Sequence, residues 1–417
     1  MVPILDPNTH AVSEVKHPVR DPKTPSSKSG PMQPSPYWGP KPIWDSQTSN
    51  HNPMMDEKGR PWFAARVRHP NNPDYCKKGS NHPSAKVYPL NESGRHLSMY
   101  DPASGKWSLI STCFPTHHLI FAEDANNTVW VSSAFGTGVV GWLNRKMFEE
   151  TGDEVRSQGW TPLILDTNGN GKRDAWVEPN QPLDPTKDKR VHLNIYAVAV
   201  NPVDGSVWGT AWWSPWPGYI IRLNPGSNPT ETALAELYEV PLPGYGPRGG
   251  DIDRNGIYWV SLASGHLGRF DRSRCKVLNG PKVAEGKHCP EGWTFYPFPG
   301  PQFRDVKAGG SAEASYYVWV DQYNTLGLGA NVPIATGNLN ESYLALVNGK
   351  FVNIRVPYPI GFFPKWGEGR IDDPNGGWKG RAMWATDSTR TIFHNEPGKE
   401  GRPRVYKIQL RPDPLAR

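Results

Sequence analysis

The chain has 417 residues and a net charge of only +6, because 46 lysines and arginines are interspersed with 40 aspartates and glutamates. Without a long basic run the sequence gives no indication of nucleic-acid binding. No apolar run approaches the roughly 18 residues of a membrane-spanning helix, and the 42 glycines and 44 prolines argue against long helices.

Residues 1–40 are rich in proline, serine and lysine and show almost no apolar periodicity. We expect them to form an extended arm that wraps the surface or is disordered. The first residues lack a charged stretch followed by an apolar one, so a secretion signal, if there was one, has been removed.

From residue 41 onward one pattern recurs: a short strand, a turn with Asp, Asn or Gly, a strand that carries tryptophan, and further short strands. The tryptophans that mark the repeats are Trp62, Trp130, Trp208, Trp259, Trp319 and Trp384. The expected strands, in chain order, are 52–55, 61–63, 96–100 and 107–110; 119–122, 129–132 and 139–143; 197–200, 207–209 and 219–223; 250–253, 258–261 and 267–271; 314–320, 342–347 and 351–356; and 381–385 and 405–410.

Short alternating strands separated by tight turns are typical of four-stranded antiparallel propeller blades. We therefore predict an all-β protein with a single β-propeller over residues 41–417, interrupted by insertions at 69–95 and 144–192. Six blades fit the repeats, with the ring closed by an N-terminal strand around residues 43–45. Seven blades are the alternative if Tyr37-Trp38 or the 357–380 stretch contains another.

The four cysteines, Cys76, Cys113, Cys275 and Cys289, show no CxxC spacing, which argues against zinc ribbons and c-type haem. Cys275 and Cys289 bracket one loop, and the other two lie in or next to the first repeat. The pattern favours two disulfides and a secreted or periplasmic protein, and four reduced buried thiols are the alternative.

Polar residues that begin the first strand of a blade should line the central channel of a propeller. Counting back from the tryptophans gives candidate catalytic residues at His51, His117, His118, Tyr196, Arg248 and Glu313, and His266 should lie on a loop of the same face. Histidine suits acid–base catalysis and is the commonest transition-metal ligand, so these positions indicate a site for Fe, Cu, Zn or Mn. The alternative is that they only line a water-filled channel or bond to the backbone.

Loops on the same face carry a second group of candidates, which would contact a substrate. They are Trp212, Trp213, Trp216 and His394. The tryptophans offer a stacking platform for a sugar or an aromatic ligand. Burial beneath a loop is the other interpretation.

A calcium-type loop lies within the second insertion. Asp166, Asn168, Asn170, Lys172 (by its carbonyl) and Asp174 match the ligand spacing of such loops, and Gly171 allows the turn. The usual twelfth position holds Val177, so Glu178 is the expected last ligand. We expect a structural Ca²⁺ that holds the insertion; the alternative is a polar Asn-Gly turn.

The segments AEDANNTVWVSS, DIDRNGIYWVSLASGHLGRFD and VNPVDGSVWGT resemble the streptogramin B lyase-like propellers and, more distantly, the gluconolactonase/regucalcin type. The resemblance covers most of residues 45–412, although that family has seven blades and lacks both insertions. It implies a propeller with its site at the channel mouth, where the lyase uses a histidine and a glutamate for elimination.

Three functions remain open at this point. The first is a lyase or hydrolase acting on a small or oligomeric extracellular substrate. The second is a metal-dependent oxygenase with histidine ligands from several blades, and the third is a non-catalytic propeller that binds a glycan or a partner. Oligomeric state is not indicated by the sequence.

Overall fold

The structure is a computed structural model that describes residues 2–6, 8–26, 47–133, 136–211, 216–302, 304, 310–357, 361–387, 405–413 and 415. The chain divides into two compact units. The first unit comprises Met1–Pro162 with Pro229–Glu231, and the second comprises Leu163–Asn228 with Thr232–Arg417.

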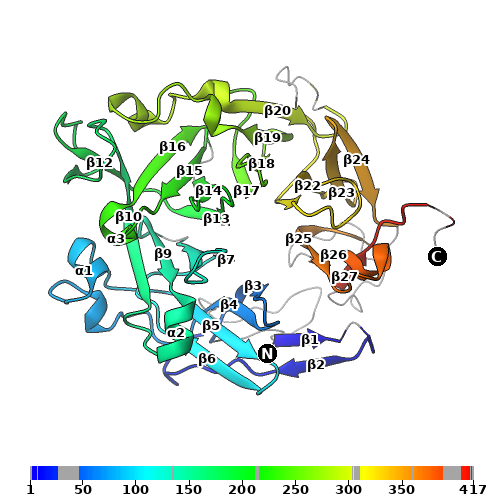
Figure 1. Ribbon diagram of the computed structural model, residues 1–417, viewed down its shortest axis with the longest axis horizontal. Coiled ribbons are helices and arrows are strands. Elements are labelled where there is room, and N and C mark those ends of the chain that lie inside the picture. The colour runs from blue at the N-terminus through cyan, green and yellow to red at the C-terminus, as the bar shows by residue number, and fades with distance from the viewer. Residues whose placement is uncertain are drawn as a thin grey trace. The chain divides into compact units, whose positions relative to one another are not determined.

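The first unit contains a hairpin and two antiparallel sheets, drawn from blue to cyan-green in Figure 1. The hairpin is β1 (Val2–Leu5) and β2 (Val12–Val15), and the sheets are β3 (His51–Met55), β4 (Pro61–Ala65), β5 (His96–Asp101) and β6 (Lys106–Ile110), then β7 (Leu119–Phe121), β8 (Val129–Ser132), β9 (Val139–Leu143) and β10 (Gln158–Leu165). The short helices are η1 (Asp74–Cys76), α1 (Pro83–Val87) and α2 (Arg145–Thr151). In each sheet, strands that follow one another in the chain pair side by side.

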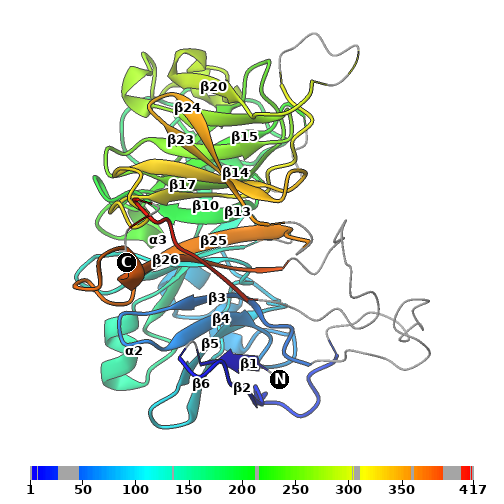
Figure 2. The same cartoon turned by 90° about the vertical axis from the view of Figure 1, so that its right-hand side faces the viewer.

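The second unit repeats the same up-and-down order in four groups of strands, the first of which continues through the end of β10, where Leu165 pairs with Ala235. They are β13 (Ile195–Val200), β14 (Val207–Ala211), β15 (Tyr219–Asn224) and β16 (Leu234–Glu239); β17 (Pro247–Ile252), β18 (Tyr258–Leu262), β19 (His266–Phe270) and β20 (Trp293–Pro297); β21 (Val318–Asp321), β22 (Val332–Gly337), β23 (Ser342–Val347) and β24 (Lys350–Arg355); and β25 (Pro364–Ile371), β26 (Arg381–Asp387) and β27 (Val405–Ile408). The remaining elements of this unit are β11 (Trp176–Val177), β12 (Asp188–Val191), η2 (Arg272–Arg274), η3 (Pro281–Glu285), η4 (Pro290–Gly292) and η5 (Gly377–Gly380), and the short helix α3 (Pro229–Thr232) belongs to the first unit except for Thr232. Figure 2 shows the strands of these sheets from the side.

The recurring turn and tryptophan form one hydrogen-bonded device. Asp56 accepts hydrogen bonds at Oδ1 from the backbone N–H groups of the residues two and four positions later, and at Oδ2 from the Trp62 indole at 3.0 Å. Asp253 does the same in another sheet, with Trp259 donating at 3.1 Å. The carboxylate therefore closes the turn between two strands and satisfies the indole N–H of a buried tryptophan, which explains the spacing of six residues.

The predicted all-β class is confirmed, and the sheets have the antiparallel up-and-down order of propeller blades. The number of blades and ring closure remain predictions, and residues 43–45 lie outside the described residues. The strand expected over 314–320 is present as β21, which is confined to Val318–Asp321 and is the first strand of its sheet. The 357–380 stretch contains β25, which is a first strand and not an additional blade.

The described part of the predicted arm, residues 2–6 and 8–26, contains the β1–β2 hairpin, and beyond it the Arg20 N–H donates to the Val67 carbonyl at 2.8 Å. His17 is buried between this segment and the sheet, with its Nε2 2.7 Å from the Ser98 hydroxyl and its ring centroid 4.1 Å from that of Trp107. Burial lowers the pKa of His17 to about 4. Apolar surroundings disfavour the charged imidazolium, so folding selects the neutral ring.

We expect His17 to make the first unit sensitive to acid. Between pH 6.5 and pH 4 the unfolded chain binds a proton at His17 and the folded chain does not, so stability falls as the pH falls. The loss attributable to His17 is about 2–3 kcal/mol at pH 4.5. The measurement is the free energy of unfolding by denaturant, for the wild type and for His17→Gln, at pH 7.5 and at pH 4.5. We expect the free energy to fall less between the two pH values in the variant than in the wild type. Equal losses in both proteins would contradict the assignment.

Both predicted disulfides are present. Cys76 pairs with Cys113 across 37 residues within the first unit, and Cys275 pairs with Cys289 across 14 residues within the second. The first bridge holds the loop of the 69–95 insertion, including η1, against the segment that follows β6. Among the described residues no helix has the length and apolar character needed to cross a membrane.

Candidate functional site

Three histidines come together in the first unit. His51 is the first residue of β3, and His117 and His118 immediately precede β7. The two strands are joined because the Asn52 side-chain oxygen accepts a hydrogen bond from the Leu119 backbone N–H at 2.8 Å. The structure therefore brings these three predicted residues together, and their role remains a prediction.

The imidazole rings face one another closely. One ring nitrogen from each histidine can be chosen so that all three lie within 4.8 Å of one another. The Nδ1 atoms of His117 and His118 are 3.2 Å apart, and the His51 ring stacks on the His117 ring with centroids separated by 4.3 Å. His117 and His118 are buried, whereas His51 is partly exposed. His51 is therefore the residue of the cluster that is most accessible to solvent.

Backbone contacts fix the orientation of these residues. The Nδ1 of His51 lies 2.9 Å from the His117 carbonyl oxygen, so this nitrogen carries the proton and donates it, which leaves Nε2 with a lone pair. The His118 N–H donates to the Ser132 hydroxyl at 3.0 Å, and the Ser132 N–H donates back to the His118 carbonyl at 2.9 Å. The neighbouring strand β8 thus holds the His117-His118 pair in place.

This donor set fits a transition-metal ion. Two nitrogens bound to zinc at about 2.0–2.1 Å in a tetrahedral arrangement lie about 3.3 Å apart, close to the separation of the His117 and His118 Nδ1 atoms. Without an ion one of the two Nδ1 atoms can donate its proton to the other, provided that one ring is protonated at Nδ1 and the other at Nε2. The pair therefore has two alternatives, a shared proton or a shared metal.

A β-bulge begins the first strand of several sheets. In each case the first strand advances three residues while its partner strand advances two, so one extra residue is inserted. The register shifts lie between His51 and Met54, Tyr196 and Ala199, Pro247 and Gly250, and Pro364 and Gly367. Bulges of this kind are common next to functional sites because they re-aim side chains.

The bulges of the second unit form a different cluster, which is cationic and aromatic. The Arg248 guanidinium donates to the Tyr316 hydroxyl at 3.0 Å and lies 4.8 Å from the centre of its ring, while the Lys365 ammonium lies 5.6 Å from the same centre. The Tyr196 hydroxyl lies 3.1 Å from that of Tyr316. Burial and the neighbouring Tyr316 raise the pKa of Tyr196, so it remains a neutral phenol at physiological pH. Tyr196 is therefore unsuited to act as a base.

The sequence did not indicate Tyr316, Tyr317, Lys365 or Trp366 as part of this cluster. Tyr316 and Tyr317 stand immediately before β21, as the two histidines stand before β7, and that correspondence was the available signal. It was missed because the count started from Trp319, which lies on the first strand of its sheet.

The other predicted catalytic residues belong to the second unit and have local bonding roles. Glu313 is buried and accepts hydrogen bonds from the Leu339 N–H at 2.8 Å and the Asn340 side-chain amide at 2.9 Å. Burial raises the pKa of Glu313. His266 begins β19, is buried, and has its Nδ1 3.0 Å from the Ser264 hydroxyl.

The predicted substrate-binding group is described only in part. Trp216 is 62% exposed and its ring centroid lies 4.9 Å from that of Tyr245. Trp212, Trp213 and His394 lie outside the described residues. The stacking platform remains a prediction.

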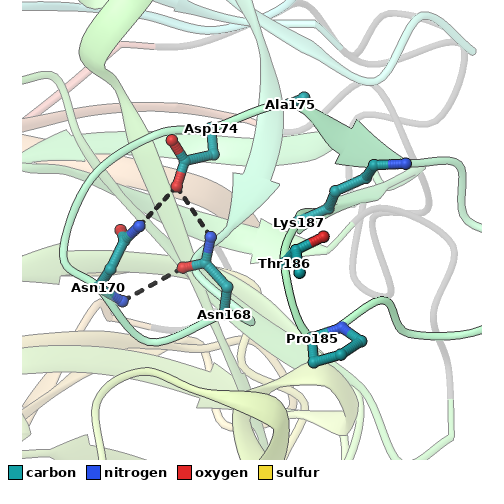
Figure 3. A pocket seen from close by; sticks show the side chains of 7 residues that line it. All are labelled: Asn168, Asn170, Asp174, Ala175, Pro185, Thr186 and Lys187. Atoms are coloured by element: carbon teal, nitrogen blue, oxygen red, sulfur yellow. Dashed lines mark hydrogen bonds between the residues drawn. The ribbon is translucent and has the colours of Figure 1, made fainter.

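The calcium-type loop of the second unit is shown in Figure 3, beside a pocket of about 430 Å³. Asp166 accepts at Oδ1 from the Gly169 N–H and at Oδ2 from the Gly171 N–H, at 2.7 and 2.8 Å. The side-chain amides of Asn168 and Asn170 both donate to Asp174 Oδ2, at 2.8 and 2.6 Å. The loop is thus folded around its own carboxylates.

Glu178, the expected last ligand, is placed differently from the rest. Its Oε2 accepts from Arg190 Nε at 2.8 Å and from a terminal guanidinium nitrogen at 2.5 Å, and its Oε1 accepts from the Trp176 indole at 3.2 Å. The carboxylate that does reach the loop is Asp188, which begins β12 and accepts at Oδ2 from the Asp174 N–H at 2.7 Å. The ligand spacing of calcium loops did not indicate Asp188. It lies outside the loop in the sequence and reaches the loop because it begins β12.

Comparisons with known proteins were made for both sequence and structure. No family model matches the chain, and no curated protein matches its sequence. Among solved structures, the chain is similar to a streptogramin B lyase, with a TM-score of 0.44 and 12% identity over 87% of this chain and 84% of that one. It is also similar to virginiamycin B lyase from Staphylococcus aureus, with a TM-score of 0.37 and 11% identity over 81% and 90% of the two chains.

A third similar structure is a luciferin-regenerating enzyme, with a TM-score of 0.40 and 10% identity over 86% of this chain and 90% of that one. The resemblance to streptogramin B lyase-like proteins noted from the sequence is thus found again among structures. At these identities it concerns the fold and does not extend to activity.

Proposed function

We propose that this protein is a metal-dependent enzyme in which His51, His117 and His118 hold one transition-metal ion, and that it catalyses a hydrolysis or an elimination. The single observation that carries the proposal is the convergence of three ring nitrogens within 4.8 Å. Two disulfides support an extracellular or periplasmic location, because such bridges persist in oxidising compartments.

Each of the three histidines would supply one ring nitrogen to the metal ion. His51 offers Nε2 because its Nδ1–H is bonded to the His117 carbonyl, and His117 and His118 offer the two Nδ1 atoms that face each other. Three neutral imidazoles leave further coordination positions for water and substrate, and a bound zinc ion would lower the pKa of that water to about 7. A metal-free state leaves the shared proton of the His117-His118 pair available for transfer.

The first experiment is elemental analysis of protein purified without a metal-affinity tag. We expect about one equivalent of Zn, Mn, Fe or Cu per chain, in line with one three-histidine site. Stoichiometric zinc or manganese directs assays to hydrolysis and elimination, and stoichiometric iron or copper favours the oxygenase instead. A protein that contains none of these metals and takes up none from their salts would overturn the proposal.

A non-catalytic binding protein is the second candidate, and the aromatic and cationic cluster of the second unit favours it. Arg248 and Lys365 place two positive charges against the Tyr316 ring, beside Tyr196. Such a surface suits an anionic ligand with an aromatic or sugar ring. Binding of anionic glycans that is lost in Arg248→Gln, in a protein without transition metal, would favour this candidate over the enzyme.

A further inference from the structure

One carboxylate of the second insertion lacks the bonds that its burial demands. The Asp188 side chain is 0% exposed, and its Oδ2 accepts from the Asp174 N–H at 2.7 Å. Its Oδ1 has no hydrogen-bond partner of normal geometry among the described residues, although the Thr167 N–H lies close enough to the carboxylate to lower its pKa. A buried carboxylate oxygen without a donor is strongly unfavourable, so such an atom calls for a positively charged or donating ligand.

Two other carboxylates add to the negative charge at the same place. Asp166 and Asp174 belong to the loop against which Asp188 packs, and both raise the pKa of Asp188, which burial and these charges together bring to about 6. Three carboxylates and two asparagine side chains make an all-oxygen donor set once the amides turn their oxygens inward. Calcium takes six to eight oxygen ligands of this kind.

We propose that the loop 166–174 and Asp188 together bind one calcium ion, with Asp188 supplying the carboxylate that Glu178 does not supply. Asp188 lies 14 residues after Asp174 and reaches the loop through its place at the start of β12. The bond between Glu178 and Arg190 leaves Glu178 as part of a salt bridge beside the site.

Two positive charges lie near these carboxylates, because Arg173 interacts electrostatically with Asp188 and Lys172 with Asp174, yet the pKa of Asp188 stays raised, so they offset the negative charge only in part. The guanidinium of Arg173 lies 5.4 Å from the centre of the Trp176 ring, and burial lowers the pKa of Arg173 to about 10. The Lys187 side chain points away from Asp174 and the two asparagines (Figure 3). A bound ion would instead break the two amide hydrogen bonds to Asp174 Oδ2, because both amides must present oxygen.

The role of this ion is structural. Asp166 directly follows β10, and Asp188 begins β12, which pairs with β10. The Asp166 carbonyl also accepts from the Gly280 N–H at 2.8 Å, within the loop closed by the Cys275–Cys289 disulfide. Calcium would therefore fasten the insertion to two other segments of the second unit. This inference is independent of the three-histidine site.

Titration calorimetry with calcium chloride on the EDTA-treated, dialysed full chain tests the proposal. We expect one site in the wild type, a Kd raised about 100-fold or more in Asp188→Asn, and a Kd within about threefold of wild type in the matched control Glu178→Gln. Thermal unfolding in EDTA separates ligation from misfolding. Asp188→Asn should unfold there at a temperature no lower than the wild type, because it removes an uncompensated carboxylate, and it should lack the rise that calcium gives the wild type.

Three results would overturn the proposal: no calcium binding by the wild type at millimolar calcium, wild-type affinity in Asp188→Asn, or loss of binding in Glu178→Gln with Asp188 intact. Near-UV circular dichroism of each variant in EDTA verifies that the second unit is folded. If Asp188→Asn proves unfolded, Asp174→Asn serves in its place, and it too must weaken calcium binding about 100-fold. Transition-metal content is measured on the same samples, so that failure of one site is not mistaken for failure of the other.

Discussion

Replacing His118 with alanine is expected to weaken transition-metal binding at least about 100-fold and to leave less than about a tenth of an equivalent in the purified protein. Two ligands remain in this variant, too few to hold a zinc-like ion against exchange into solvent. The His118 backbone still donates to Ser132, so the strand should keep its place. The measurement is metal content by mass spectrometry, together with a zinc titration against a competing chelator.

The matched control for this variant is His69→Ala, because His69 is exposed and lies outside the cluster in the same unit. His51→Ala should behave like His118→Ala, since His51 provides the third ring. Full metal content in both cluster variants would mean that the ion is bound elsewhere, and the three rings would then have only a structural role. Loss of metal in His69→Ala, with full metal content in the two cluster variants, would also show that the ion is bound outside the cluster.

Replacing Arg145 with methionine is expected to destabilise the protein by about 3 kcal/mol. The Arg145 side chain is 2% exposed and lies 2.5 Å from a Glu57 oxygen, 3.4 Å from a Glu149 oxygen and 3.8 Å from an Asp56 oxygen. Methionine fills similar space but leaves these carboxylates without their shared cation. Arg60 remains beside Asp56 and Glu149, which places the cost at the low end for a broken buried ion pair.

The neighbouring residue of the same helix provides the control for Arg145. Lys146→Met removes the same charge from an exposed position of α2 and should change stability by no more than about 0.5 kcal/mol. Urea unfolding of both variants at pH 7.5 measures the difference. An equal effect of the two substitutions would show that net charge matters and that the buried network does not.

Much of the strand pattern could be predicted because the Asp–turn–Trp device recurs. Nine strands among the described residues were not predicted: β1, β2, β10, β11, β12, β16, β20, β22 and β25. Two of them show why, because β16 (LAELYE) has the composition of a helix and β25 (PKWGEGRI) has no apolar alternation. Their strand conformation comes from pairing with β15 and β26. Tertiary pairing of this kind overrides local preference and leaves no mark in the sequence.

The candidate sites were predictable where ligands are close in sequence or share a position in the repeat. His51 begins a first strand and the His117-His118 pair immediately precedes one, so a count from the tryptophans found them. Asp188 could not be found in this way, because its distance from Asp174 along the chain obeys no ligand rule. The same applies to Lys365, which a bulge in an unrecognised strand brings to Tyr316.

The bulges that begin β3, β13, β17 and β25 suggest how this scaffold acquires new chemistry. Each sets an extra residue outside the regular ladder, so its side chain can change without disturbing the pairs on either side. The first residue inside the bulge is Asn52, Ala197, Arg248 and Lys365 in the four sheets, so a polar, a small and two cationic side chains already occupy this place. Substitutions at these positions can therefore introduce new functional groups, in evolution or by design, while the packed core of each sheet stays the same.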